Sequence, residues 1–128
     1  MYYDVAHNVE GISAMIKTIS NSHADKKVVG LFSLKSDKNI KPICNVIKNN
    51  FEIIILCHDK SGYLSKATVL EKILNENNIK CFSVSSVKKG VEALEKYNDD
   101  YVKIIFGSHY IAEEVYTATG KHFDTTNN

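Results

Sequence analysis

Short apolar runs alternate along the chain with segments in which apolar residues recur every three or four positions. The run VVGLF at 28–32 is continuously apolar and FEIIIL at 51–56 nearly so, which is typical of strands buried on both faces of a sheet. The segments between the runs have the periodicity of amphipathic helices. This alternation predicts an α/β fold of three layers, with a mostly parallel sheet of about five to six strands and helices on both of its faces.

Local signals support the ends of the predicted helices. Asn8 and Ser86 have the residue type and place of N-caps, and Pro42 lies in a first turn, where its missing N–H is tolerated. Gly120 follows the last helix, as a C-cap glycine does, and the polar tail at 122–128 is expected to fray. The expected strands span residues 2–5, 28–32, 51–56, 80–84 and 102–106, and the expected helices span residues 9–19, 39–48, 66–77, 87–97 and 109–119.

Composition narrows the class of protein. The 128 residues have the length of one domain, and a hydrophobic content of 44% suffices for a core. The 16 basic and 15 acidic side chains are interspersed, so we expect neither a nucleic acid nor a membrane as partner. Cys44, Cys57 and Cys81 are an odd number without a C-x-x-C spacing, and no signal peptide opens the chain; this favours reduced, buried thiols in a cytoplasmic protein.

Three polar clusters each follow a predicted strand. They are Asp4 with His7-Asn8, then Ser36-Asp37-Lys38, and then Gly107-Ser108-His109. If the strands are parallel, right-handed crossovers bring all three loops to one edge of the sheet. Ligands of open α/β sheets bind at this edge, so we expect the clusters to form one site.

The residue types in these clusters favour an anionic ligand. Lys38 is a compact charge suited to a carboxylate or phosphate. Gly107 and Ser108 open a predicted helix, whose N–H groups and dipole favour an anion, and Gly107 allows close approach to the backbone. Asp4 can accept hydrogen bonds from a ribose hydroxyl or organise a cation. Together they predict a site for an anionic small molecule beside a nucleotide.

Purely structural roles remain open for the same residues. Asn8 can be a plain N-cap, Asp4 can cap the same helix, Lys38 can be solvated, and His7 can serve packing. Gly107-Ser108 can be ordinary turn chemistry. Cys57-His58-Asp59 looks like a metal or nucleophile cluster, but adjacent residues do not easily converge on one ion. The chain has neither G-x-x-x-x-G-K-[ST] nor G-x-G-x-x-G, so we expect no phosphate-cradling loop of its own.

Three segments, in order, resemble one enzyme family. Asp4-Val5-Ala6-His7-Asn8 resembles the D-[GV]-A-H-N motif that opens the C-terminal domain of folylpolyglutamate synthases and of bifunctional dihydrofolate/folylpolyglutamate synthases. The strand at 28–32 followed by Ser36-Asp37-Lys38-Asn39 resembles the strand and D-K-D segment of that family. Residues 104–110, IIFGSHY, resemble its closing strand and G-S-[LF]-[YH] turn. The wider superfamily is that of the Mur ligases, whose third domain has the same Rossmann-like build.

The resemblance implies an activity and roles for residues. These ligases use ATP to phosphorylate a carboxylate, and the amine of an amino acid then displaces the phosphate. In the folate branch the amino acid is L-glutamate and the acceptor is a folate. By this resemblance Asp4 contacts ATP, and His7, Lys38 and Ser108 hold or orient the glutamate. Asn8, Asp37 and Gly107 would support them.

The resemblance also implies what lies outside the chain. The P-loop, the Mg²⁺ ligands, the folate pocket and the carbamylated lysine of the family belong to two other domains. We therefore expect residues 1–128 to be the C-terminal domain of a larger enzyme, joined to a central ATPase domain, with Met1 an artificial or alternative start. Such a fragment is expected to contain no catalytic residue or metal site and to be inactive alone.

This sequence departs from the family at three places, and other functions remain open. Asn39 replaces the second acid of D-K-D, Ser61-Gly62-Tyr63-Leu64 stands where relatives carry Pro-Arg-Ala, and His109 takes a usually apolar or aromatic position. One alternative is a Mur ligase that acts on a peptidoglycan precursor, although the His of D-x-A-H-N favours folates. Another is a stand-alone, non-catalytic module that binds a small anion or a partner. A phosphoacceptor receiver domain needs an Asp at the end of the third strand, where Leu56-Cys57-His58 offers none.

Overall fold

The computed structural model describes residues 1–120 as a five-stranded, wholly parallel sheet with helices on both faces. This confirms the predicted α/β fold; the tail at 122–128 lies outside the described residues. The elements in chain order are β1 (Tyr2–Asp4), α1 (Val9–Ser22), β2 (Lys27–Phe32), α2 (Lys41–Asn50), β3 (Ile53–Cys57), α3 (Ala67–Glu76), β4 (Cys81–Val84), α4 (Val87–Glu95), β5 (Tyr101–Phe106), the 3₁₀ turn η1 (His109–Ile111) and α5 (Ala112–Thr119).

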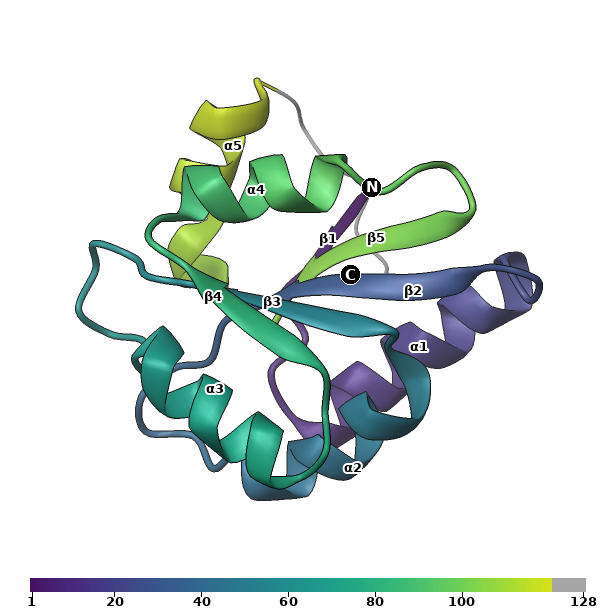
Figure 1. The fold of residues 1–128 in the computed structure, drawn as a ribbon, viewed down its shortest axis with the longest axis horizontal. Helices are drawn as coiled ribbons and strands as arrows, with labels where there is room; N and C mark the ends of the chain where they lie inside the picture. The colour runs from purple at the N-terminus through teal and green to yellow at the C-terminus, as the bar shows by residue number, and fades with distance from the viewer. Residues whose placement is uncertain (121–128) are drawn as a thin grey trace.

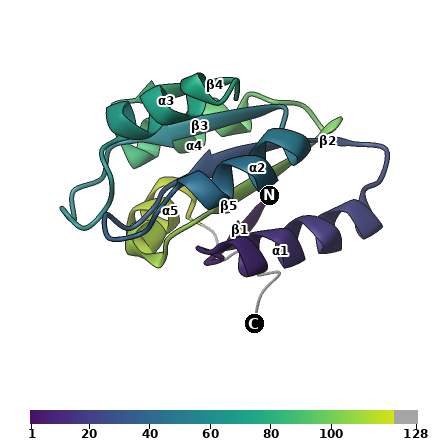
Figure 2. The same ribbon diagram turned by 90° about the horizontal axis from the view of Figure 1, so that it is seen from below.

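The strands lie in the order β1-β5-β2-β3-β4. The helices α1, α2 and α3 cover one face of the sheet, and α4 and α5 cover the other (Figures 1 and 2). Strand β5 therefore leads to one helical layer, whereas its neighbours β1 and β2 lead to the opposite layer. The loops that leave the carboxyl ends of these three strands diverge from one another, and such a point in an open parallel sheet is where a ligand crevice forms.

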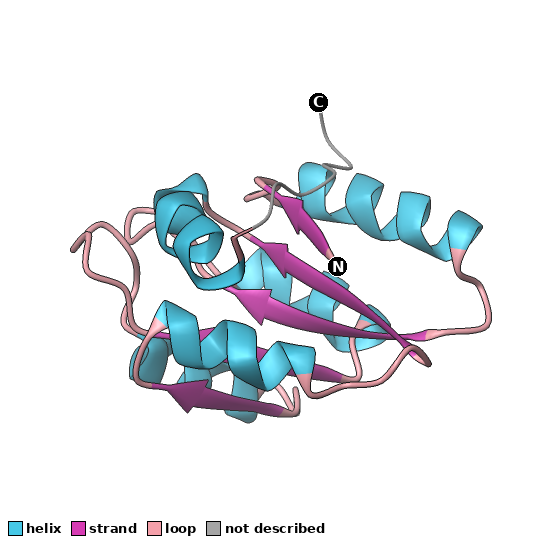
Figure 3. Ribbon diagram, turned by 90° about the horizontal axis from the view of Figure 1, so that it is seen from above, coloured by secondary structure: helices cyan, strands magenta, loops and turns pink. Residues whose placement is uncertain are grey.

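Alternation of side chains along the central strands builds two cores, one on each face of the sheet. On β2, Phe32 packs against the layer of α1, α2 and α3, whereas Val29 and Leu31 pack against α4 and α5. The same division separates Ile104 and Phe106 from Ile105 on β5. All of these side chains are fully or nearly fully buried, which explains why the runs lack a polar face. Figure 3 shows the sheet between its two layers.

The capping predictions are confirmed. Asn8 Oδ1 accepts the N–H of Gly11 at 2.8 Å, and Ser86 Oγ accepts the N–H of Lys89 at 3.1 Å. Pro42 lies in the first turn of α2, and Gly120 ends α5 with a left-handed φ of 64°. No helix within residues 1–120 is both long and apolar enough to cross a bilayer.

Several details differ from the predictions. The strand expected from residue 51 begins at Ile53, because Phe51 ends α2 and stacks on Phe106 with ring centroids 5.0 Å apart. The last helix begins at Ala112, after a 3₁₀ turn that was not foreseen. Cys44 and Cys57 are buried as expected, but the prediction was wrong for Cys81, which is only half-buried because β4 is an edge strand.

Candidate functional site

A small pocket of about 180 Å³ lies at the carboxyl edge of the sheet, where the loops after β1, β2 and β5 meet. This confirms that parallel strands bring the three loops together. The pocket is lined by Val5, His7, Lys35, Lys38, Gly107, Ser108, His109 and Tyr110. It lies at the divergence between β5 and its two neighbours, the crevice that the topology of the sheet creates.

Gly107 and Ser108 form one wall of this pocket. Gly107 has φ of +107°, and a Cβ there would lie 1.8 Å from the carbonyl oxygen of Ser33. Glycine is thus required for close packing of β5 on the loop after β2, rather than for close approach of a ligand as the sequence suggested. The hydroxyl of Tyr3 donates to the carbonyl of Ser108 at 2.7 Å. Burial raises the pKa of Tyr3 far above its ordinary value, so this donor keeps its proton.

Ser108 combines capping with access to the pocket. Its side chain is nearly buried, and its Oγ accepts the N–H of Tyr110 at 3.1 Å. A hydroxyl that accepts one hydrogen bond retains an O–H that can donate another. The turn that follows is a short 3₁₀ segment, so the expected anion site at a regular helix N-terminus is replaced by this capped turn and the side chains around it.

The loop after β1 presents His7 and buries Asp4. The Oδ1 of Asp4 accepts the N–H of Ala6 at 2.8 Å, and the residue has no exposed surface. His7 is exposed, and its Nδ1 lies 3.1 Å from the carbonyl oxygen of Val5. A carbonyl oxygen only accepts, so Nδ1 donates this hydrogen bond and Nε2 is not used by it. Asp4 therefore fixes the turn from which His7 projects.

The loop after β2 supplies the positive charge. Lys35 and Lys38 both line the pocket, and the N–H of Lys38 donates to the carbonyl of Lys35 at 3.0 Å, which closes a tight turn. The Nζ of Lys35 lies 3.3 Å from Oδ2 of Asp37. Lys35 also forms an isolated antiparallel bridge with Leu64, which ties this loop to the loop after β3. The lining contains two lysines and no carboxylate, so the described pocket favours an anion.

The structure brings together some of the predicted residues and not others. His7, Lys38, Gly107 and Ser108 line the pocket. Asn8 is occupied as the N-cap of α1, Asp37 is exposed beside Lys35, and Asp4 is buried below the loop. The prediction missed three lining residues, Val5, Lys35 and Tyr110, and it gave no separate role to His109, which belongs to the predicted cluster at 107–109.

Lys35 and His109 both left a signal in the sequence. Lys35 lies one residue before the polar cluster at 36–38, and His109 ends the cluster at 107–109. Tyr110 gave no polar signal, because it acts through ring packing. Its ring stacks on His109, with centroids 4.5 Å apart, and on Tyr63, with centroids 5.1 Å apart.

The segment Cys57-His58-Asp59 does not form a reactive cluster. Cys57 ends β3 and is buried, and burial raises the pKa of its thiol to about 12, with smaller contributions from Asp59 and Glu114. The carboxylate of Asp59 accepts hydrogen bonds from the N–H and the hydroxyl of Ser61. Within residues 1–120, no group of three or more His, Cys, Asp or Glu side chains could hold a metal ion.

Comparison with known proteins identifies similar domains. A family model described as "Mur ligase, glutamate ligase domain" matches residues 1–109. None of the curated protein sequences matches the chain significantly. Among solved structures, folylpolyglutamate synthase from Mycobacterium tuberculosis complexed with ADP is similar over 94% of this chain and 30% of its own, with 20% identity and a TM-score of 0.80.

Two further structures are similar to the same extent. They are the bifunctional folylpolyglutamate synthase/dihydrofolate synthase from Yersinia pestis complexed with AMPPNP and Mn ion, and a bifunctional enzyme of this kind with Mn, AMPPNP and L-glutamate bound. Each matches over 92% of this chain and 28% of its own, with 19% identity and a TM-score of 0.76. The chain thus spans less than a third of the length of these relatives, and the likeness to them is one of fold.

Proposed function

Because this chain belongs to the family of Mur ligase glutamate ligase domains, we propose that it is the C-terminal domain of a larger ATP-dependent amide ligase that adds L-glutamate to folates. In this proposal residues 1–128 supply the glutamate site, and a central ATPase domain and the folate pocket lie elsewhere in the same cytoplasmic polypeptide. The fragment alone does not catalyse ligation.

The observation that carries the proposal is the cationic pocket at the carboxyl edge. Three loops bring Lys38, Ser108 and His7 to one cavity of about 180 Å³, whose lining holds no carboxylate. Glutamate carries two carboxylates and one ammonium group, so it needs cations and hydroxyl donors beside one acceptor. The pocket provides this combination.

Lys38, Ser108 and His7 each have a polar atom that can contact the ligand. The ammonium of Lys38 pairs with a carboxylate of glutamate, and the free O–H of Ser108 donates to the same group. Nε2 of His7 accepts a hydrogen bond from the amino group of glutamate, since Nδ1 is occupied by Val5. Gly107, Asn8 and Asp37 support these three by shaping the wall, capping α1 and holding Lys35. These residues bind and orient the amino acid.

The nucleotide and its metal are not held by the described residues alone. Residues 1–120 contain no cluster of side chains for a metal ion, and the chain contains no phosphate-cradling loop. We therefore derive no step through either group from this domain, and assign ATP and Mg²⁺ to the other domains of the enzyme. Asp4 is proposed to act on ATP only through the turn that it holds, because its carboxylate is buried.

A peptidoglycan precursor is the second candidate acceptor, since the matching family model covers Mur ligases generally. The similarity to folylpolyglutamate synthases and His7 in the first motif favour a folate. A stand-alone module that binds an anion or a partner without catalysis is the third candidate. No feature of the pocket favours this module over the ligase.

The first test is the intact mass of the native polypeptide in its own host, detected with an antibody to this domain. A product several-fold heavier than the 128-residue chain is expected. A product of the mass of the chain alone would contradict the multidomain ligase and favour the stand-alone module.

The second test is an assay of that polypeptide with ATP, Mg²⁺, L-glutamate and either tetrahydrofolate or a UDP-linked peptidoglycan precursor. We expect a product one glutamyl residue heavier from the folate alone. Lys38→Ala should raise the KM for glutamate at least about tenfold, the worth of one carboxylate pair, without changing the KM for ATP. The exposed Lys41, which does not line the pocket, provides the control Lys41→Ala.

A further inference from the structure

The outer edge of β4 carries main-chain hydrogen-bonding groups that no described strand uses. Strand β4 is the last strand of the sheet, and no described strand pairs with its far side. The N–H of Ile54 donates to the carbonyl of Lys80 at 3.0 Å, and the N–H of His58 donates to that of Val84 at 3.3 Å. A parallel ladder uses every second residue of the strand. The N–H and C=O groups of Cys81 and Ser83 therefore point away from the sheet.

A hollow of about 610 Å³ is lined by residues of β4 and of the segment that contains α4. A second hollow, of about 500 Å³, is lined by residues of α3 alone, on the helix that packs against the other face of β4. Successive side chains of a strand point to opposite faces of a sheet, so a strand added beside β4 would direct alternate side chains toward α4 and toward α3. The free edge and the two hollows together match an extended peptide.

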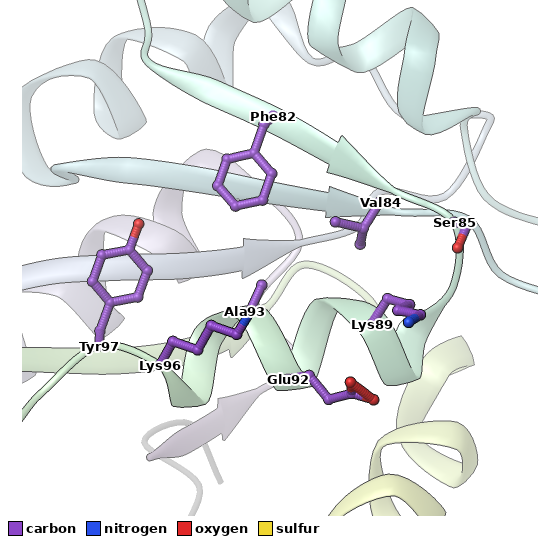
Figure 4. Close-up of a pocket in the computed structure, with 8 residues that line it drawn as sticks. All are labelled: Phe82, Val84, Ser85, Lys89, Glu92, Ala93, Lys96 and Tyr97. Atoms are coloured by element: carbon purple, nitrogen blue, oxygen red, sulfur yellow. The ribbon is translucent and has the colours of Figure 1, made fainter.

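The hollow on the side of α4 has an apolar floor and a basic rim. In Figure 4 the rings of Phe82 from β4 and of Tyr97, which follows α4, lie across the groove from each other. Lys89 and Lys96 line it as well, with Glu92 as the one acidic residue of this lining. The hollow on α3 is lined by polar residues, and one of them, Glu71, accepts a hydrogen bond from the hydroxyl of Ser83 at 2.8 Å.

The two lysines set the spacing of charges on a partner. Lys89 and Lys96 are seven residues apart, which corresponds to about 10 Å of helix rise. Neighbouring residues on one face of a strand are about 6.6 Å apart, so two acidic residues four positions apart are separated by about 13 Å. This separation is enough for each acid to reach one of the two lysines. One residue between the two acids faces the same side. That middle position faces the apolar floor.

We propose that β4 binds an extended acidic peptide segment of a partner protein as a sixth strand, with the pattern acid-x-apolar-x-acid facing α4. The outward N–H and C=O groups of Cys81 and Ser83 supply the main-chain hydrogen bonds, and the groove of Phe82 and Tyr97 takes the apolar residue. Lys89 and Lys96 pair with the acids, which sets the specificity. Strand addition of this kind obtains affinity from the main chain and specificity from alternate side chains.

The test uses the end-capped peptide Thr-Asp-Thr-Phe-Thr-Asp-Thr and the ¹⁵N-labelled 128-residue chain. Binding is expected to slow hydrogen exchange of the Cys81 and Ser83 amides and to shift resonances of Lys89, Lys96 and Tyr97. Lys89→Glu should weaken binding at least about tenfold, since it reverses a charge at the interface. Lys88→Glu is the matched control, because Lys88 is exposed on the same helix but does not line the groove, and it should leave the affinity unchanged.

Two N-methylated peptides test the main-chain contacts without altering the protein. One carries methyl groups on its odd residues and the other on its even residues, so one set alone blocks the N–H groups that face β4. We expect one peptide to lose binding and the other to keep it. Equal effects of the two sets, no binding at millimolar peptide, or protection of Cys81 and Ser83 by self-association of the chain without peptide would each overturn the proposal.

Discussion

Gly107 lies where β5 turns into the pocket, and its place cannot be taken by a larger residue. A Cβ there would lie 1.8 Å from the carbonyl oxygen of Ser33, and its φ of +107° is one that side chains rarely adopt. A side chain at this position would therefore be strained in its own backbone and would also force the backbone of the loop after β2 to move. The wall of the pocket therefore requires glycine at position 107.

Gly107→Ala is therefore expected to lower the free energy of unfolding by about 3 kcal/mol or more, through overpacking and backbone strain. Gly62→Ala is the control, since Gly62 also has a positive φ, of +77°, but meets nothing within 4 Å. This variant should cost only about 1 kcal/mol, from backbone strain without a steric clash. Urea unfolding monitored by circular dichroism measures both, and similar losses would show that the contact with Ser33 is unimportant.

The buried thiol of Cys57 makes the free energy of unfolding depend on pH in the alkaline range. Burial raises the pKa of its thiol from 9.0 to about 12 in the folded state, so the unfolded chain releases this proton first as pH rises. The folded state then binds more protons than the unfolded state, and stability falls with increasing pH. The loss begins near pH 9 and continues to about pH 12.

The variant Cys57→Ala removes this group and should flatten the decline of stability at alkaline pH, although it costs packing at every pH. Urea unfolding at a series of pH values measures the slope. The half-buried Cys81, whose pKa burial raises to about 11, supplies the comparison variant Cys81→Ala. It should flatten the decline less, and an identical slope in the wild type and Cys57→Ala would contradict the assignment.

At the scale of helices and strands, two similar N-caps lie at opposite ends of the sheet. Asn8 caps α1 next to His7, after the outermost strand β1, and Ser86 caps α4 after the other outermost strand, β4. Each side-chain oxygen satisfies one N–H that the helix leaves free. Loss of either cap should therefore lower stability similarly, whereas only loss of the first should disturb the pocket.

Asn8→Ala and Ser86→Ala are each expected to lower the free energy of unfolding by about 1 kcal/mol. In an NMR spectrum, Asn8→Ala should also shift the resonances of His7 and Ser108, and Ser86→Ala should leave them in place. Perturbation of the pocket by both variants would mean that general loosening, rather than the local cap, is responsible.

The sequence predicted these elements because their signals are local. Apolar period and caps depend on neighbouring residues, so α1 and α4 were found with their caps. The beginning of β3 was missed because Phe51 ends α2 and is partly buried through stacking on Phe106, which is distant in the sequence. The burial of Asp4 and the membership of Tyr110 in the pocket likewise depend on contacts across the fold. No local pattern encodes such contacts.

At the scale of the whole molecule, the strand order decides where a ligand can bind. Strand β5 lies between β1 and β2 but leads to the opposite helical layer, and the pocket lies where these loops diverge. The sequence predicted parallel strands and hence convergence of the loops, but it did not fix this order. The second feature of the molecule, the free edge of β4, lies at the other end of the sheet and is independent of the pocket.

An NMR titration of the ¹⁵N-labelled 128-residue chain with L-glutamate tests most directly whether this pocket binds glutamate. Binding is expected in the millimolar range, worth about −4 kcal/mol, because the other domains are absent. Resonances of His7, Lys38, Ser108 and His109 should shift, the shifts should vanish in Lys38→Ala but persist in Lys41→Ala, and L-glutamine should bind more weakly. Shifts confined to residues outside the pocket, or none with L-glutamate at saturating concentration, would contradict binding in this pocket.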